Sequence, residues 1–185
     1  IMGDVCTRAC GFCDVKTGKP GSLDWEEPKR VAESVNTMGL SHAVITSVNR
    51  DDLNDGGSLF FAETIREVKK YNNGCDVEVL IPDFKGDRIA INNIIEASPE
   101  VINHNLETVP RLQREIRTSA SYGRSLSLLH YVKSQGFEGK TKTGLIVGMG
   151  ESKEEVIAVL KDISKLDVDI VTIGQYLRPT AKHRP

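Results

Sequence analysis

The sequence predicts an α/β protein built on a parallel β-sheet. Short apolar runs rich in β-branched residues alternate with segments of helical periodicity from end to end, which is typical of βαβ units. No linker or low-complexity segment interrupts this alternation, and 185 residues is close to the length of one domain. We therefore expect residues 1–185 to form a single domain of six β/α units.

Six segments have the pattern of buried strands, and a polar loop follows each of them. The predicted strands are residues 2–5, 42–48, 77–81, 101–103, 143–147 and 170–173. Periodicity alone leaves open whether they form an open, doubly wound sheet or an incomplete barrel.

The segments between these strands carry helical signals. Pro28 stands where the first turn of a helix tolerates proline. Ser152 and Glu155 have the spacing of a capping box. Apolar residues recur at helical spacing at Val31, Val35, Met38, Ile157, Leu160, Ile163 and Leu166.

The unusual polar clusters all follow predicted strands. They are residues 6–13, 50–57, 104–107, 148–151 and 175–180. Because the carboxyl ends of parallel strands open onto one side of the sheet, where ligands bind, five such clusters predict one active site.

The composition argues against several classes of protein. With 24 Lys and Arg against 26 Asp and Glu, the net charge is -2, so no overall field favours nucleic acid or anionic lipid. Apolar runs such as residues 145–147 are far shorter than the roughly 18 residues of a membrane span, and no signal-peptide pattern is present. We expect a protein of the cytoplasm, or of the mitochondrial or plastid matrix in a eukaryote. Because the chain begins at Ile1, we expect it to be a fragment.

Cys6, Cys10 and Cys13 have the spacing C-x3-C-x2-C, and Cys75 lies far from them. Nothing indicates secretion, so we expect reduced thiols rather than a disulfide framework. A closed zinc site fits poorly, because no second C-x2-C pair or H-x3-H spacing is present. Three thiolates would leave one iron of a four-iron cluster open for chemistry, and an iron–sulfur cluster is the favoured interpretation. Another metal and incidental thiols remain alternatives, and Cys75 is best explained as a buried apolar residue.

The segment from Cys6 to Cys13, with Phe12 before the last cysteine, resembles the signature of radical S-adenosylmethionine (SAM) enzymes. The resemblance implies that Cys6, Cys10 and Cys13 are the catalytic, metal-binding residues that hold a 4Fe-4S cluster, whose fourth iron binds SAM. It also implies the fold of these enzymes, and so favours a parallel (β/α)6 partial TIM barrel.

Longer blocks are similar to lipoyl synthases. They are residues 13–20, 44–57, 103–112 and 174–180, so the likeness extends over the whole chain. The likeness implies a lipoyl synthase-type sulfurtransferase of lipoate biosynthesis. Such an enzyme uses a 5′-deoxyadenosyl radical to insert two sulfur atoms into an octanoyl group on a lysine. The implied partners are an octanoylated lipoyl carrier domain or H protein and an electron donor such as ferredoxin or flavodoxin.

The resemblance also implies which residues contact the cofactor. Residues 144–151 resemble the G-x-I-x-G-x-x-E pattern that flanks adenine, the glycines before residue 58 approach the methionine end of SAM, and residues 105 and 107 suit the ribose hydroxyls. The implied cofactor-binding residues are Phe12, Asp55, Gly56, Gly57, Asn105, Glu107, Gly148, Glu151, Gln175 and Leu177.

These residues also have explanations that involve no ligand. Paired glycines usually form a turn, residues 144–151 could be only a strand that runs into a helix, and polar strand ends can form a capping network. His104 is best explained as a structural residue, and the basic residues 182–184 as a solvated terminus.

The chain departs from lipoyl synthases in ways that matter. Their N-terminal three-cysteine motif and C-terminal serine, which hold a second, auxiliary cluster as the sulfur source, are not among these 185 residues. We therefore expect this segment not to insert sulfur by itself. Asn49 stands where aspartate is usual, and Arg178 where glutamine is common. The alternative functions are a biotin synthase-type or methylthiotransferase-type radical SAM enzyme, and a non-catalytic metal-binding module.

Overall fold

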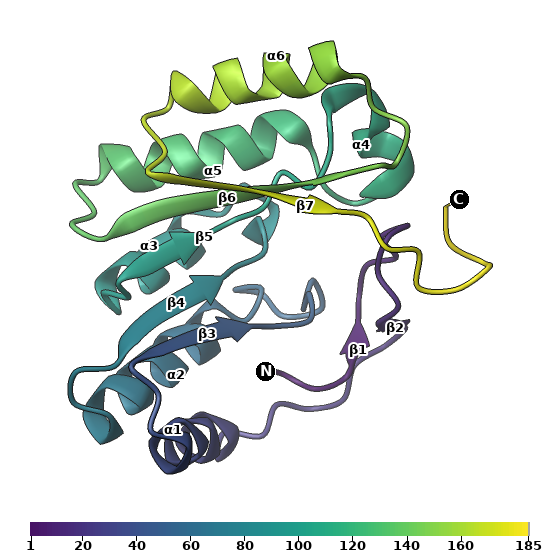
Figure 1. The fold of residues 1–185 in the computed structure, drawn as a ribbon. Helices are drawn as coiled ribbons and strands as arrows, with labels where there is room; N and C mark the ends of the chain where they lie inside the picture. The colour runs from purple at the N-terminus through teal and green to yellow at the C-terminus, as the bar shows by residue number, and fades with distance from the viewer. Residues whose placement is uncertain (185) are drawn as a thin grey trace.

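The computed structural model describes residues 1–184, and its centre is a parallel sheet with helices packed on it (Figure 1). The strands follow one another in space as they do in sequence, in the order β3-β4-β5-β6-β7. The sheet consists of β3 (His42–Thr46), β4 (Asp76–Leu80), β5 (Val101–Asn103), β6 (Lys140–Val147) and β7 (Ile170–Gln175). A separate parallel pair, β1 (Val5–Cys6) and β2 (Lys16–Thr17), brackets the cysteine-rich loop.

Helices occupy the connections between the strands, as expected for βαβ units. They are α1 (Glu27–Met38), α2 (Ser58–Tyr71), α3 (Arg88–Glu96), α4 (Pro110–Ile116), α5 (Tyr122–Ser134) and α6 (Lys153–Ser164), with a short 3-10 helix η1 (Phe84–Gly86) after β4. Two sequence predictions are confirmed here, because Pro28 lies in the first turn of α1 and a capping box joins Ser152 to Glu155 at the start of α6.

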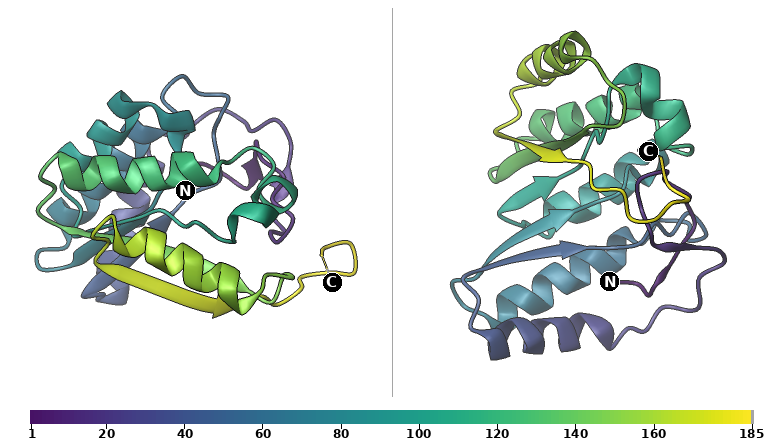
Figure 2. Two further views of the ribbon diagram at one scale, coloured as in Figure 1. Left: turned by 90° about the horizontal axis from the view of Figure 1, so that it is seen from above. Right: turned by 45° about the vertical axis from the view of Figure 1, so that its right-hand side comes forward.

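The two faces of the sheet differ in burial. In β3, Ala43 and Ile45 belong to the hydrophobic core, whereas Val44 between them points to the other face and is 55% exposed. Phe60 and Phe61 of α2 are buried in the same core, where each contributes on the order of 2 to 3 kcal/mol by leaving water. The helices therefore pack on one face of the sheet (Figure 2), while the face that carries Val44 is exposed at β3.

Five of the six predicted strands lie in the sheet, but the first does not. Met2 and Gly3 have φ angles of 70° and 93°, which interrupt an extended strand over residues 2–5. Instead, the Met2 side chain enters the core and the Ile1 amine donates to the Thr46 carbonyl at 2.7 Å. The sheet therefore contains five β/α strands rather than six, and only the pair β1–β2 retains strand structure near the amino terminus.

Strand β6 begins at Lys140, three residues before its predicted start. Its first residues are polar because they make specific contacts: Lys142 pairs with Glu78 at 2.8 Å, and Thr141 donates from its hydroxyl to Asp169 at 2.8 Å. Because these residues are polar, hydrophobic patterning in the sequence could not reveal that the strand begins at Lys140.

The cysteine-rich loop and the segment after β7 meet at the carboxyl ends of the strands. The cysteine-rich loop and the segment after β7 lie beside each other in Figure 2, right, and His183 Nε2 donates to the Cys13 carbonyl at 3.1 Å. None of the helices within residues 1–184 is long and apolar enough to cross a membrane.

Gly57 allows Met2 to pack beneath the turn that precedes α2. Its φ is 86°, and a Cβ atom at this position would lie 2.8 Å from Met2 Cε. We expect Gly57→Ala to lower the free energy of unfolding by about 2 to 4 kcal/mol, because backbone strain and overpacking add. Thermal unfolding of the cofactor-free protein measures this.

Gly123→Ala is the matched control, because no atom lies within 4 Å of a Cβ built there and the residue lies inside α5. Alanine is the better helix former, so this variant should be as stable as the parent or slightly more stable. Equal stability of the two variants would contradict the packing argument.

Candidate functional site

A cavity of about 410 Å³ opens beside the cysteine-rich loop, at the carboxyl ends of β3, β4 and β5. This volume is within the usual range for a small-molecule site. The cavity brings together six of the residues singled out in the sequence: Cys6, Cys10, Phe12, Cys13, Asn105 and Glu107.

The three cysteines of the loop differ in exposure. All are free thiols, with Cys6 buried, Cys10 partly buried and Cys13 exposed. Within residues 1–184, no three His, Cys, Asp or Glu side chains are gathered closely enough to hold a metal ion. Burial raises the pKa of the Cys10 thiol to about 11, and the nearby Arg117 opposes the rise. Cys10 is therefore a protonated thiol near neutral pH and would release its proton on binding a metal.

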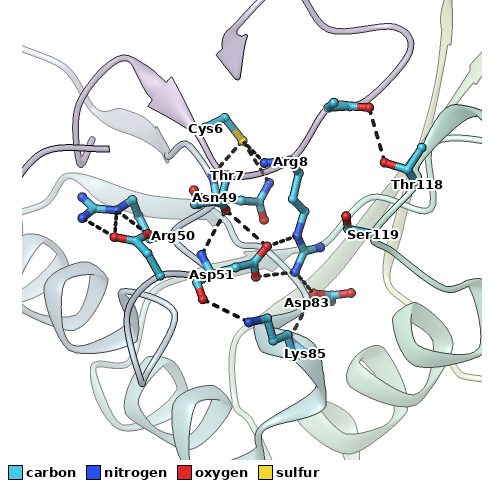
Figure 3. A network of polar contacts seen from close by, with 12 residues as sticks. Cys6, Thr7, Arg8, Asn49, Arg50, Asp51, Asp83, Lys85, Thr118 and Ser119 are labelled. Carbon is cyan, nitrogen blue, oxygen red and sulfur yellow. Dashed lines mark hydrogen bonds and ion pairs between the residues drawn. The ribbon is translucent and has the colours of Figure 1, made fainter. Parts of the chain in front are cut away.

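Arg8, between the first two cysteines, anchors this loop to the sheet (Figure 3). Its Nε and Nη2 atoms donate to the two carboxylate oxygens of Asp51 at 2.6 and 2.8 Å. Nη2 also donates to Asp83 at 2.7 Å. The guanidinium is buried, so these charge-assisted bonds are protected from water and fix the loop against residues that follow β3 and β4.

Asp83 is a fully buried carboxylate that two arginines neutralise. Arg124 Nη1 donates to it at 2.9 Å, and Arg8 donates from the opposite side. Burial alone would raise its pKa, but the two guanidinium groups and the Lys85 backbone amide hold the pKa of Asp83 at about 2. The cavity wall therefore contains a fixed negative charge with matched positive partners.

Asn105 and Glu107 lie where the chain continues past β5 along β6. The Glu107 amide donates to the Gly144 carbonyl at 2.9 Å, and the Ile146 amide donates to the Glu107 carbonyl at 2.7 Å. Asn105 Oδ1 is buried and accepts no hydrogen bond from the described residues, so it can receive one from a ligand. Burial raises the pKa of the Glu107 carboxyl, and Arg117 opposes this.

His104 lines the cavity, but both of its ring nitrogens are occupied. Nδ1 donates to the Ile81 carbonyl and Nε2 accepts from the Ser125 hydroxyl, each at 2.8 Å. Burial and the nearby positive charge of Arg117 lower its pKa to about 4. The ring is therefore neutral, which agrees with the structural role expected from the sequence.

The remaining predicted contacts lie outside the cavity. Asp55 accepts from the Gly57 and Leu59 amides at 3.0 and 2.9 Å and so caps α2. Gly56 packs against Phe84, with a φ of 61°. These residues form a tight turn whose contacts are all within the protein.

The loop after β6 is also stabilised by hydrogen bonds within the loop. Glu151 accepts from the backbone amides of Gly148 and Met149, while Gln175 packs over Gly148. Leu177 is 80% exposed. These predicted residues lie near the carboxyl ends of β6 and β7, away from the cavity lining.

Sequence reasoning missed the residues that hold the cavity wall. Arg8, Asp51, Asp83 and Arg117 were not singled out, although Arg8 lies between two cysteines of the motif. For Asp83 a signal was available, because it follows the predicted strand 77–81 in the way that the other polar clusters follow theirs. For Arg117, which donates to the Leu106 carbonyl at 3.0 Å, the sequence offers no comparable signal.

The family model of the radical SAM superfamily matches residues 1–163. The chain therefore belongs to the radical SAM superfamily. Membership implies a 4Fe-4S cluster and SAM as cofactors in general.

Within this superfamily the chain is similar to lipoyl synthases, which confirms the resemblance found in the sequence. It is 54% identical over 185 residues to the lipoyl synthase of Flavobacterium johnsoniae and 57% identical to that of Rubrobacter xylanophilus. It is also 54% identical to the mitochondrial lipoyl synthase of Nematostella vectensis. The matches cover 100% of this chain but 64%, 58% and 63% of those proteins, so the chain spans less than two thirds of their length.

Solved structures support the fold. Methylornithine synthase (PylB) superposes with a TM-score of 0.77 at 20% identity, covering 99% of this chain and 53% of that one. SuiB of Streptococcus suis, bound to SAM, superposes with a TM-score of 0.75 at 14% identity, covering 98% and 40%. At these identities the likeness shows the fold alone, and it confirms the predicted partial barrel.

Arg8 provides a test of the loop anchor. We expect Arg8→Gln to lower the free energy of unfolding of the cofactor-free protein by about 2 to 4 kcal/mol, because Asp51 loses its guanidinium partner and Asp83 keeps only Arg124. The control is Arg30→Gln, since Arg30 and Asp24 form an exposed pair with side chains 56% and 58% exposed. That variant should unfold in urea with nearly the same midpoint as the parent, because an exposed ion pair contributes little to stability. Similar losses in both variants would contradict the anchor.

His104 predicts a pH dependence of stability. Its pKa in the folded protein is about 4, below the ordinary value of 6.5, so the unfolded chain takes up a proton first as pH falls. Stability should be fully present above pH 6.5 and decline by about 3 kcal/mol toward pH 4. Denaturant unfolding at a series of pH values measures this.

In His104→Gln the part of the slope between about pH 6.5 and 5 should disappear, because carboxylates such as Asp83 add to the slope only nearer pH 4. That part should persist in His130→Gln, because His130 is exposed. Persistence of the slope in His104→Gln would assign it to other groups.

Proposed function

We propose that this chain is the SAM-cleaving core domain of a lipoyl synthase. The observation that carries the proposal is the convergence of three reduced thiols, from one short loop, on a cavity that also contains unpartnered polar acceptors. The whole-chain similarity to lipoyl synthases supports the choice within the superfamily.

The residues present fit the two implied cofactors. Thiolates are the usual ligands of iron–sulfur clusters, and Cys6, Cys10 and Cys13 would hold three irons and leave one open. Asn105 Oδ1 and Ser47 Oγ are buried at the cavity and have no hydrogen-bond partner among the described residues. A ligand rich in hydroxyl and amino groups, such as SAM, would provide these partners.

We assign the other predicted contacts by the same resemblance. Phe12 would contact the bound cofactor, and Asn105 with Glu107 would hydrogen-bond the ribose hydroxyls. The remaining assigned contacts are Asp55, Gly56, Gly57, Gly148, Glu151, Gln175 and Leu177. These residues lie outside the cavity lining, close to the carboxyl ends of β3, β6 and β7.

The chemistry that the cofactors supply when bound is one-electron cleavage of SAM to methionine and a 5′-deoxyadenosyl radical, which takes hydrogen from an unactivated carbon. The chain itself would position the cofactors and shield the reaction from water. Arg8 fixes the start of the cysteine loop. Phe12, Val48, Ile81 and Pro82 line the cavity with apolar groups, which limits the access of water to a reactive species.

The proposed substrate is an octanoyl group carried on a lysine of a lipoyl carrier domain or H protein, and the proposed reductant is a ferredoxin or flavodoxin. Sulfur insertion would need an auxiliary cluster, whose three-cysteine motif and serine lie outside these 185 residues. We therefore propose that residues 1–185 bind one cluster and cleave SAM without inserting sulfur.

The test is electron paramagnetic resonance (EPR) of the anaerobically reconstituted, dithionite-reduced protein with and without SAM. We expect a 4Fe-4S signal that changes on addition of SAM, together with release of methionine and 5′-deoxyadenosine. Alanine at Cys6, Cys10 or Cys13 should abolish cluster binding, because each supplies one iron ligand.

Cys75→Ala is the matched control. Cys75 is buried near the start of β4, away from the cavity, and should be dispensable for iron binding. Full iron content in all three motif variants, or stoichiometric zinc in place of iron, would overturn the proposal in favour of a metal-binding module.

A further inference from the structure

The three cysteine sulfurs differ in the hydrogen bonds they accept. Cys6 Sγ accepts from the Asn49 backbone amide at 3.3 Å, from the Arg8 backbone amide at 3.4 Å and from Asn49 Nδ2 at 3.7 Å (Figure 3). Among residues 1–184, no hydrogen bond to the sulfur of Cys10 or Cys13 is present. If this loop holds a cluster, the Cys6 ligand would therefore be the one cysteine sulfur that accepts hydrogen bonds from the described residues.

Asn49 is held in place by its backbone. Its carbonyl accepts from the Thr7 amide at 3.1 Å and from the Thr7 hydroxyl at 3.0 Å, so the residue is tied to the loop directly after Cys6. Thr7 also joins Asp51, next to the Arg8 anchor. The side-chain amide is therefore positioned at Cys6 by contacts that do not depend on a ligand.

The orientation of the amide has a chemical reason. Asn49 Oδ1 is buried and accepts no hydrogen bond from the described residues, while Nδ2 points to the sulfur. An iron-bound thiolate has no proton to donate, so only the nitrogen of the amide can interact favourably with it. A buried carbonyl without a partner is rare and calls for an explanation, which this contact supplies.

We propose that Asn49 acts through Cys6 as a positioning residue that raises the reduction potential of the cluster. The inference rests on the proposed function, since it requires the cluster. Hydrogen bonds to cluster sulfurs withdraw negative charge from the metal site and so favour the reduced state. Cys6 Sγ accepts from two backbone amides and from the Asn49 side chain. Only the side-chain donor can be removed by a substitution.

The experiment is an EPR-monitored redox titration of the reconstituted cluster in the absence of substrate. Asn49→Leu keeps a similar shape but has no donor, so its midpoint potential should be lower than that of the parent. Asn49→Asp has no donor when ionised and adds a negative charge, so its potential should be lower still. The midpoint potential should therefore be highest in the parent, lower in Asn49→Leu and lowest in Asn49→Asp.

Asn54→Asp is the matched control, because Asn54 is an exposed residue of the same connection between β3 and α2 and adds the same charge in solvent. Its potential should equal that of the parent. If Asn49→Leu fails to fold, Asn49→Ser serves instead, since its side chain is too short to reach the sulfur. Sulfur K-edge absorption gives a second measurement, in which loss of the donor should increase the covalency of the iron–sulfur bonds.

The outcomes separate this inference from the proposed function. A parent protein without a SAM-responsive cluster would contradict the proposed function. A parent with a normal cluster, and Asn49 variants with unchanged potentials and sulfur spectra, would overturn only the role of Asn49. A purely structural role predicts lower unfolding temperatures without the ordered shift in potential.

Discussion

The ion pairs of Arg8 with Asp51 and Asp83 are the constraint on which the site depends. The cysteine loop contributes little to the two hydrophobic clusters, so apolar packing does not fix it. A buried guanidinium between two carboxylates does, because all three groups lose hydration and are stable only in contact with one another. The same contacts bring residues that follow β3 and β4 to the first cysteine, and so define one end of the cavity.

The charges of the wall are organised around this anchor. Arg124 neutralises the second oxygen of Asp83, and Lys85 donates to the Asp51 carbonyl at 3.0 Å. Arg117, a little further along the wall, lies near Cys10 and Glu107. The charges of Arg8 and Arg124 are thus matched by carboxylates, and Arg117 is the positive group that favours a thiolate at Cys10.

The sequence could predict what depends on local patterns. Five strands and the capping box of α6 follow from periodicity and from the spacing of Ser152 and Glu155. The missing sixth strand depends on the positive φ angles of Met2 and Gly3, and a methionine in that conformation leaves no mark in the sequence. Arg8 and Asp83 are 75 positions apart, and no local rule indicates which carboxylate an arginine will meet. The long-range ion pairs that hold this part of the site could therefore not be predicted from the sequence.

The contacts that hold the cysteine loop are unevenly distributed along it. Cys6 is fixed by β1, by three N–H donors and by the neighbouring Arg8, whereas Cys13 is exposed and its carbonyl is held by His183 from the far end of the chain. The three thiols do not lie close enough to share one metal ion, whereas in a cluster each would bind a different iron. The loop is therefore held most firmly at Cys6, where hydrogen bonds and burial fix the sulfur against the sheet, and least firmly at the exposed Cys13.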